Sequence, residues 1–247
     1  MPDDDALPPP PSLESLKGEG DIALFLDFDG TLVDLAPTPD GIVPADGLAA
    51  RLSQIASVLS DRLALVSGRA IIDLERHLGP IALACAGSHG SDCRKASGEP
   101  LGDPPGGLPE EALAAIREFA QEQGFELEDK PHGAALHYRA SPVLEPQGLA
   151  FASSLARQHA LDVKRGKCVI ELVARGANKG AAVAAFMGEA EFAGATPVFI
   201  GDDVTDEDGF AKARELGGFG ILVGIRPGTN ATFGLANVAA VHQWLGL

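Results

Sequence analysis

Cysteine is scarce in this sequence, and its spacing points to no familiar site. The 247 residues include three cysteines, Cys85, Cys93 and Cys168, and no two of them form a C-x-x-C pair. An odd number without this spacing argues against a disulfide framework and against a zinc site. We therefore expect three reduced thiols, as in a cytoplasmic protein.

Basic residues are also few. There are 19 Lys and Arg against 35 Asp and Glu, which gives a net charge of −16. Nucleic acid backbones are bound by stripes of Lys and Arg, and anionic membrane surfaces attract the same residues. We therefore expect neither nucleic acid nor a membrane as a partner.

Long apolar runs are missing as well. No segment approaches the ~18 apolar residues that a membrane helix requires. Residues 1–11 contain three consecutive aspartates and four consecutive prolines, and they have neither the basic start nor the apolar core of a secretory signal. We expect a cytoplasmic protein whose residues 1–20 form a flexible N-terminal tail.

The composition that is present, 45% hydrophobic and 22% charged residues, is that of a globular protein with a core. Short apolar runs that stop at polar residues or glycine predict strands buried on both faces of a parallel sheet. These runs are residues 22–26, 63–66, 81–86 and 197–200. Helical patterns occupy residues 48–59, 71–78, 179–187 and 208–216. The alternation predicts an α/β, doubly wound parallel sheet core over residues 21–107 and 175–247.

The middle of the chain breaks this alternation. Residues 98–109 are dense in Gly and Pro and have the composition of a linker. A helix, two strands, a second helix and two more strands are then predicted over residues 110–123, 125–130, 134–139, 145–159, 161–164 and 167–173. We therefore predict a small inserted α+β domain of αββαββ order over residues 108–174.

Polar side chains follow the predicted core strands where each strand ends, and others open a later helix. They are, in chain order, Asp27, Asp29, Ser67, Gly68, Arg69, Asn178, Lys179, Asp202 and Asp203. Ligands of open α/β sheets bind at the carboxyl ends of the strands. We expect these groups to meet at one place.

Their chemistry points to phosphoryl transfer. Clustered carboxylates repel one another unless a cation neutralises them, and oxygen ligands without His or Cys favour Mg²⁺. Ser67 offers a hydroxyl to a phosphate oxygen, and Lys179 offers a positive charge to the same phosphate. A carboxylate nucleophile with these partners indicates a reaction through an aspartyl-phosphate.

The same residues resemble, in order, the four motifs of the haloacid dehalogenase (HAD) superfamily: D-x-D-G-T from Asp27, then Ser67, Lys179 and G-D-D ending at Asp203. The resemblance covers residues 22–247. The segments LALVSGR (63–69), AGSHG (86–90), ALHYR (135–139), GKCVIEL (166–172) and PVFIGDDVTD (197–206) are similar to those of the trehalose-6-phosphate phosphatases. In that family the inserted domain is a cap over a HAD-type core.

The resemblance implies a role for each matched residue. Asp27 is the implied nucleophile, and Asp29 is the implied general acid and then the general base. The implied metal site contains Asp27, the backbone carbonyl of Asp29, Asp202 and the neighbouring Asp203. Lys179 is an implied catalytic residue that binds the phosphate. The implied substrate-binding residues are Ser67, Gly68, Arg69, His89, Lys130, Lys167, Glu171 and Asn178.

The resemblance further implies a hydrolase, an Mg²⁺-dependent phosphatase that converts trehalose 6-phosphate to trehalose and phosphate in the last step of trehalose biosynthesis. Functional pairing with a trehalose-6-phosphate synthase follows, and we expect a monomer or a weak dimer. One departure is visible. Val173 and Ala174 stand where many relatives have a Lys-Pro or Arg-Pro pair, at a hinge position, so cap motion is expected to differ while the chemistry is kept.

Plainer interpretations compete for several of these residues. Asp206, Glu207 and Asp208 fit charges at a helix N-terminus better than further metal ligands. Lys167 and Glu171 alternate along a strand and fit a solvated cross-strand pair on pattern alone. His89 fits a structural hydrogen bond as well as a substrate contact.

Other functions also stay open. A sucrose-phosphate or mannosyl-phosphoglycerate phosphatase has the same kind of core and cap. A phosphoacceptor signalling domain also uses an Asp, paired acids and a Lys, but its paired acids follow the first strand and it needs no cap. A non-catalytic sensor of the sugar phosphate is disfavoured because Asp27, Asp29, Lys179 and Asp202 are all present.

Overall fold

A computed structural model describes residues 6–102, 107–130, 132–166 and 168–247, and the chain divides into two compact units. Unit 1 comprises Met1–Gly102 and Asn178–Leu247, and unit 2 comprises Asp103–Ala177. The domain borders predicted from the sequence, at 108 and 174, stay predictions. No helix in the described ranges has the length and apolar character to cross a membrane.

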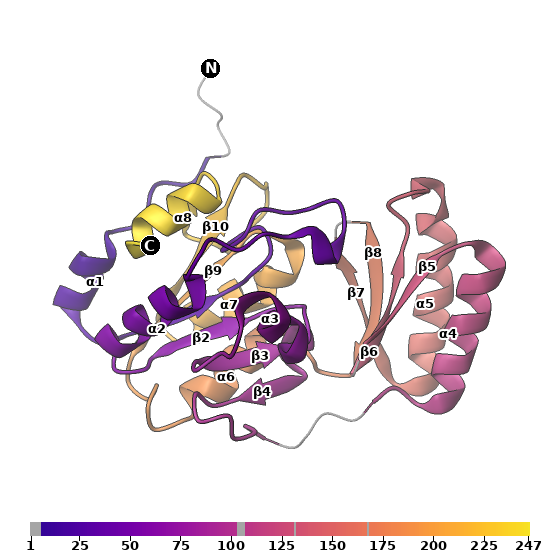
Figure 1. The fold of residues 1–247 in the computed structure, drawn as a ribbon, viewed down its shortest axis with the longest axis horizontal. Coiled ribbons are helices and arrows are strands. Elements are labelled where there is room, and N and C mark those ends of the chain that lie inside the picture. The colour runs from indigo at the N-terminus through magenta and orange to yellow at the C-terminus, as the bar shows by residue number, and fades with distance from the viewer. Residues whose placement is uncertain (1–5, 103–106, 131, 167) are drawn as a thin grey trace. The chain divides into compact units, whose positions relative to one another are not determined.

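Unit 1 is built on a seven-stranded sheet in the order β11-β10-β9-β1-β2-β3-β4, parallel except for the edge pair β3 and β4 (Figure 1). Its strands are β1 (Ile22–Leu26), β2 (Leu63–Val66), β3 (Ala84–Gly87), β4 (Asp92–Arg94), β9 (Thr196–Gly201), β10 (Phe219–Val223) and β11 (Phe233–Leu235). Its helices are α1 (Leu13–Glu19), α2 (Leu48–Val58), α3 (Ile71–Leu78), α6 (Lys179–Met187), α7 (Glu207–Glu215) and α8 (Val238–Leu245). The predicted α/β core with a mostly parallel sheet is confirmed.

Helices cover both faces of this sheet, because successive residues of a strand point to opposite faces. Leu24 and Leu26 of β1 pack in one apolar cluster with residues of α2, α3 and α8. Ala23 and Phe25 pack in a second cluster with residues of α6 and α7. All five residues of β1 are buried, which explains why the strand appears in the sequence as an unbroken apolar run.

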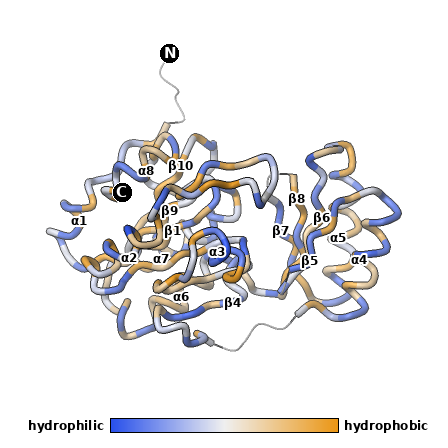
Figure 2. Tube along the Cα trace, viewed as in Figure 1, coloured by the Kyte–Doolittle hydropathy of each residue, from blue (hydrophilic) through white to orange (hydrophobic). Residues whose placement is uncertain are grey.

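In the described residues, unit 2 contains a four-stranded antiparallel sheet in the order β5-β6-β8-β7 and two α-helices. Its elements are α4 (Glu110–Gln123), β5 (Glu126–Lys130), β6 (Gly133–His137), α5 (Glu145–His159), β7 (Leu161–Gly166) and β8 (Val169–Ala174). Ala112 and Ile116 of α4 and Ala152 of α5 share an apolar core with residues of the sheet. Figure 2 shows hydrophilic and hydrophobic residues alternating along both helices, as expected where only one side of a helix is packed.

The flexible tail expected over residues 1–20 stays a prediction, although part of this segment forms a helix. Residues 1–5 lie outside the described residues, and α1 occupies much of the rest. The carbonyl of Pro8 accepts a hydrogen bond from the amide of Gly234 on β11, at 2.9 Å. Proline lacks an amide hydrogen but keeps its carbonyl, so a proline-rich segment can still bind along a strand as it does here.

Candidate active site

The site lies where β9, β1 and β2 end, at neighbouring positions of the sheet. β1 pairs in parallel with both β2 and β9, so the carboxyl ends of the three strands share one edge. Asp27 directly follows β1, and its amide donates to the carbonyl of Ile200 on β9 at 2.9 Å. This hydrogen bond continues the strand pairing to Asp27 itself, which places its carboxylate rigidly at the edge.

A buried lysine lies between two carboxylates at this edge. Lys179 Nζ donates to Asp27 Oδ1 and to Asp206 Oδ1, each at 2.6 Å. The side chain of Asn178 caps α6 by accepting from the amide of Ala181 at 2.7 Å, so Lys179 is the first residue of that helix. Side-chain exposure is 3% for Lys179, 5% for Asp27 and 0% for Asp206, so all three charges are shielded from water.

The pKa values of Lys179 and Asp27 are both raised, but for different reasons. Burial alone lowers the pKa of Lys179, but the charges of Asp206 and Asp27 and their hydrogen bonds outweigh it and raise that pKa above its ordinary value. Burial raises the pKa of Asp27 well above its ordinary range, the charges of Asp206 and Asp202 add to this, and Lys179 opposes it. The site holds more negative charge than its lysine neutralises.

Asp206 is the site residue that the sequence analysis did not select. Its Oδ2 accepts from the amide of Asp202 at 2.9 Å and from that of Asp203 at 2.8 Å, while its Oδ1 accepts from Lys179. The predicted role at a helix N-terminus is present too, because Asp203 and Asp206 form a capping box around the turn Val204–Asp206. The sequence feature that could have indicated its role is its position four residues after Asp202.

Three carboxylates are close enough to share one cation. Oxygens of Asp27, Asp202 and Asp206 all lie within 4.8 Å of one another. The carboxylate of Asp202 also packs against Gly30, three residues after Asp27. A Cβ added at Gly30, where φ is +77°, would lie 2.3 Å from Asp202 Oδ2. An all-oxygen set with excess negative charge fits Mg²⁺.

The other two predicted metal ligands are placed differently. Asp203 Oδ1 accepts from the amide of Val204 at 2.8 Å, and this residue is not part of the three-carboxylate group. The carboxylate of Asp29 contacts Arg69 instead, with Arg69 Nε at 2.7 Å and Nη2 at 2.8 Å. The predicted involvement of Asp29 through its backbone carbonyl stays a prediction.

Arg69 has carboxylate partners on two sides. Its Nη1 donates to Asp73 Oδ2 at 2.6 Å, in addition to the fork on Asp29. Burial acts to lower its pKa, but the hydrogen bonds and charges of Asp29 and Asp73 raise the pKa further. The predicted contact of Arg69 with substrate stays a prediction.

Ser67, Gly68 and His89 form one packed group beside the Asp27 edge. The amide of Ser67 donates to the carbonyl of Ala86 at 2.8 Å, and the amide of His89 donates to the carbonyl of Ser67 at 2.9 Å. The His89 ring lies so close that a Cβ at Gly68 would be 2.7 Å from its Cε1. Ser88 and His89 have φ of +48° and +56°, and such strained backbone is typical of functional sites.

Unit 2 carries a separate group of charged side chains. Lys130 Nζ donates to Glu171 Oε1 at 2.7 Å, and their side chains are 11% and 10% exposed. Glu128 and Glu171 both lie opposite Ala135 in the sheet register, so they share a face. The predicted residue Lys167 lies outside the described residues.

Glu128 joins this group, although the sequence analysis did not select it. It pairs with His137 Nε2 at 2.8 Å and lies 4.0 Å from Lys130 Nζ. Burial alone raises the pKa of Glu128, but the hydrogen bond to His137 and the charge of Lys130 lower it below its ordinary value. Alternation along β5 places Glu128 on the same face as Lys130, and the pairing of Glu128 and Glu171 with Ala135 brings Glu171 to that face.

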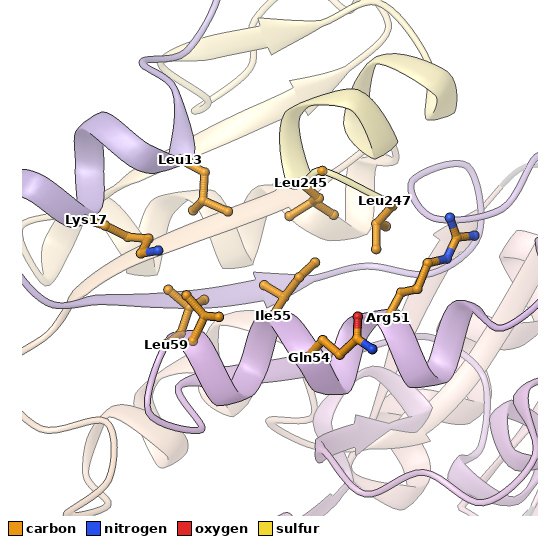
Figure 3. A pocket seen from close by; sticks show the side chains of 10 residues that line it. Leu13, Lys17, Arg51, Gln54, Ile55, Leu59, Leu245 and Leu247 are labelled. Carbon is orange, nitrogen blue, oxygen red and sulfur yellow. The ribbon is translucent and has the colours of Figure 1, made fainter.

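A pocket lies elsewhere in unit 1. Figure 3 shows it between α1, α2 and the C-terminal residues, with Leu13, Ile55, Leu59 and Leu245 as apolar walls and Lys17 and Arg51 as cations. None of its lining residues is among the predicted site residues. The arrangement with the chemistry of phosphoryl transfer is therefore the carboxylate and lysine cluster at Asp27.

Comparison with known proteins covers nearly the whole chain. A family model described as trehalose-phosphatase matches residues 25–238. The trehalose-6-phosphate phosphatase of Escherichia coli (strain K12) is 38% identical over 240 residues, which are 95% of this chain and 89% of that protein. The probable trehalose-phosphate phosphatase of Sinorhizobium fredii is 36% identical over 236 residues, 91% of this chain and 85% of that protein.

Solved structures agree on the fold. The C-terminal domain of the C. albicans trehalose-6-phosphate phosphatase superposes with a TM-score of 0.80 at 21% identity and covers 99% of both chains. A phosphatase of the haloalkanoate (HAD) superfamily from Bacteroides thetaiotaomicron gives a TM-score of 0.66 at 14% identity, over 92% of this chain and 93% of that one. At these low sequence identities, the two solved structures show that the fold is shared.

Proposed function

Because this chain belongs to the trehalose-phosphatase family, we propose that it hydrolyses trehalose 6-phosphate to trehalose and phosphate through an aspartyl-phosphate on Asp27. The observation that carries this proposal is the buried contact of Asp27 with Lys179 beside Asp202 and Asp206. A carboxylate held at a strand end by a protonated lysine is placed to attack phosphorus. A trehalose-6-phosphate synthase supplies the substrate.

The proposed first step forms a bond between Asp27 Oδ and phosphorus as the bond from phosphorus to the sugar oxygen breaks. Asp29 gives its proton to that oxygen, because a sugar alkoxide is a poor leaving group. In the second step Asp29 takes a proton from water, the water oxygen bonds to phosphorus, and the Asp27 carboxylate leaves. General acid and base catalysis of this kind is worth ~10²–10⁴-fold.

Mg²⁺ fits the carboxylates at this edge. Asp27 and Asp202 would hold it, with Asp206 close to both, and the bound cation would neutralise charge on the phosphoryl oxygens. Lys179 adds a fixed positive charge on the nucleophile's side, which answers how a chain of net charge −16 binds a phosphate ester. The net charge of the whole chain therefore does not determine the local charge that the phosphate meets at this site.

The remaining predicted residues divide between phosphate and sugar. Ser67 and Gly68 bind the phosphate in this proposal, together with Lys179. Glu171 and Lys130 are buried charged groups whose hydrogen-bonding capacity suits sugar hydroxyls. Lys167, His89 and Asn178 are proposed as further substrate contacts on the family resemblance.

A panel of sugar phosphates tests the substrate. We expect phosphate release from trehalose 6-phosphate with kcat/KM at least about 10²-fold above that for glucose 6-phosphate, since unmade hydrogen bonds to a missing sugar ring leave buried polar groups unpaired. Released phosphate is measured under identical conditions, with sucrose 6-phosphate and mannosyl-phosphoglycerate as the closest competitors. Equal rates on glucose 6-phosphate, or a higher rate on either competitor, would contradict disaccharide specificity for trehalose 6-phosphate.

Magnesium binding without substrate tests the metal site. We expect calorimetry to detect Mg²⁺ binding to chelator-treated protein and the Asp202→Asn variant to weaken it by at least about 10-fold, since one ligand is lost from a small set. Asp203→Asn is the matched neighbour, because Asp203 lies outside the three-carboxylate group. A larger loss at Asp203 than at Asp202 would show that the metal set differs from the one proposed.

A further inference from the structure

Arg69 forms two hydrogen bonds with Asp29, the residue that acts as acid and base in the proposed reaction. Its Nε and Nη2 reach Asp29 Oδ2 and Oδ1 at 2.7 and 2.8 Å, so both carboxylate oxygens are engaged by one planar guanidinium. The Arg69 side chain is 10% exposed and that of Asp29 is 29% exposed. This is the geometry of a group that fixes the orientation of another side chain.

Arg69 is itself held from two directions. Its amide donates to Ser67 Oγ at 3.1 Å, and its carbonyl accepts from the amide of Ser88 at 2.8 Å. Its third nitrogen, Nη1, donates to Asp73 in the first turn of α3 at 2.6 Å. The guanidinium is thus held to α3 through Asp73, and the Arg69 backbone is held to Ser67 and Ser88.

The backbone of Asp29 forms a bridge with Val33, but this bridge does not fix the rotamer of its side chain. Asp29 follows the buried strand by three residues and precedes Gly30, where φ is +77°. Its carboxylate is the more exposed member of the pair. Without a partner, a short side chain in such a place samples more than one rotamer.

We propose that Arg69 is a positioning residue that aims the Asp29 carboxylate, in place of the substrate-binding role the sequence analysis gave it. The proposal rests on the proposed function, in which Asp29 passes a proton to the leaving sugar oxygen and later receives one from water. A carboxylate has about four acceptor directions on its two oxygens, so the Arg69 fork leaves directions open toward the reacting atoms. A misplacement of ~1 Å at such a group costs about 10²-fold in rate.

A second group of possible metal ligands lies near Arg69, but a metal ion is not needed to explain its contacts. Asp40, Asp73 and His77 place possible metal ligands within 4.8 Å of one another. Asp73 already accepts from Arg69 and, at 3.0 Å, from Arg76. Two guanidinium groups on one carboxylate meet its charge without a metal ion.

The leaving group separates positioning from substrate binding. With trehalose 6-phosphate we expect Arg69→Ala to lower kcat about 10- to 10²-fold and to change KM less than about threefold. With p-nitrophenyl phosphate, whose leaving group needs no proton, the pre-steady-state burst of nitrophenolate should stay within about threefold of wild type. Later turnover should still be slow, because the second step needs Asp29 as base.

Two further variants make each outcome decisive. Arg69→Lys keeps the charge but cannot form the fork, so we expect it to recover only part of the lost kcat. Arg76→Ala removes the other arginine on Asp73 and should behave as wild type, since its side chain is 66% exposed. A rise in KM with unchanged kcat would overturn the positioning role, and so would a loss in the rate of the nitrophenolate burst as large as the loss of kcat with trehalose 6-phosphate. If wild type itself fails to hydrolyse trehalose 6-phosphate, the proposed function fails instead.

Discussion

The Asp27→Asn variant is expected to lose at least about 10⁴-fold in the rate of phosphate release from trehalose 6-phosphate, which is the scale at which loss of a nucleophile acts. An amide nitrogen or oxygen does not replace the carboxylate as nucleophile, so no phosphorylated enzyme forms. The measurement is phosphate release at saturating substrate, with acid-quenched protein analysed by mass spectrometry for the added phosphoryl group. Wild type should carry that group on Asp27, and the variant should carry none.

The fold should survive this substitution. Burial and the charges of Asp206 and Asp202 raise the pKa of Asp27. A raised pKa favours the folded state at low pH, and that contribution is lost as pH rises through the folded-state value. Asparagine removes the cost of the buried charge at neutral pH, so we expect the variant to be at least as resistant to urea as wild type.

A matched control lies at the opposite end of the same strand. Asp21 precedes β1, and its side chain is 70% exposed and pairs with Arg62. Asp21→Asn should keep wild-type turnover. Substantial turnover by Asp27→Asn, or a phosphoryl group on another residue, would contradict the assignment of the nucleophile.

Local signals account for the parts of the fold and site that were predicted. The runs at β1, β2 and β9 are apolar because both faces of those strands are buried. Asp27 and Asp202 follow such runs directly, so their place at the carboxyl edge follows from strand polarity alone. The opening of α6 at Lys179 is likewise marked by its cap, Asn178.

The missed features depend on contacts between distant segments. Asp206 lies in a run of acids, and only the fold shows that this one acid reaches Lys179, 27 residues away along the chain. The pairing of Asp29 with Arg69 spans 40 residues and depends on rotamers. Neither β10 nor β11 is among the strands predicted from the sequence; β11 has three residues, and a strand this short gives weak periodicity.

The Lys179→Met variant is expected to have the largest effect on stability. Methionine keeps most of the length of the unbranched side chain but leaves Asp27 and Asp206 buried without the cation that contacts both at 2.6 Å. Removing one partner of a buried ion pair costs about 3–5 kcal/mol because a buried charge loses its partner. The raised pKa of Lys179 means that its contribution is fully present at neutral pH and is lost only in strong alkali. We therefore expect the free energy of unfolding in urea to fall by that amount at pH 7, without added metal.

A second substitution separates loss of the cation from a general packing defect. In the Lys179→Met, Asp206→Asn double variant one of the two uncompensated carboxylates is gone, so we expect part of the lost stability to return. Lys212→Met removes a lysine from a pair with Glu215 on the surface of α7, and this control should change the unfolding free energy by less than about 1 kcal/mol. If Lys179→Met lowered the free energy of unfolding no more than Lys212→Met, the buried lysine would not be what stabilises the two carboxylates in the folded site. A double variant less stable than Lys179→Met would lead to a different conclusion, that Asp206 acts mainly by capping the amides of Asp202 and Asp203.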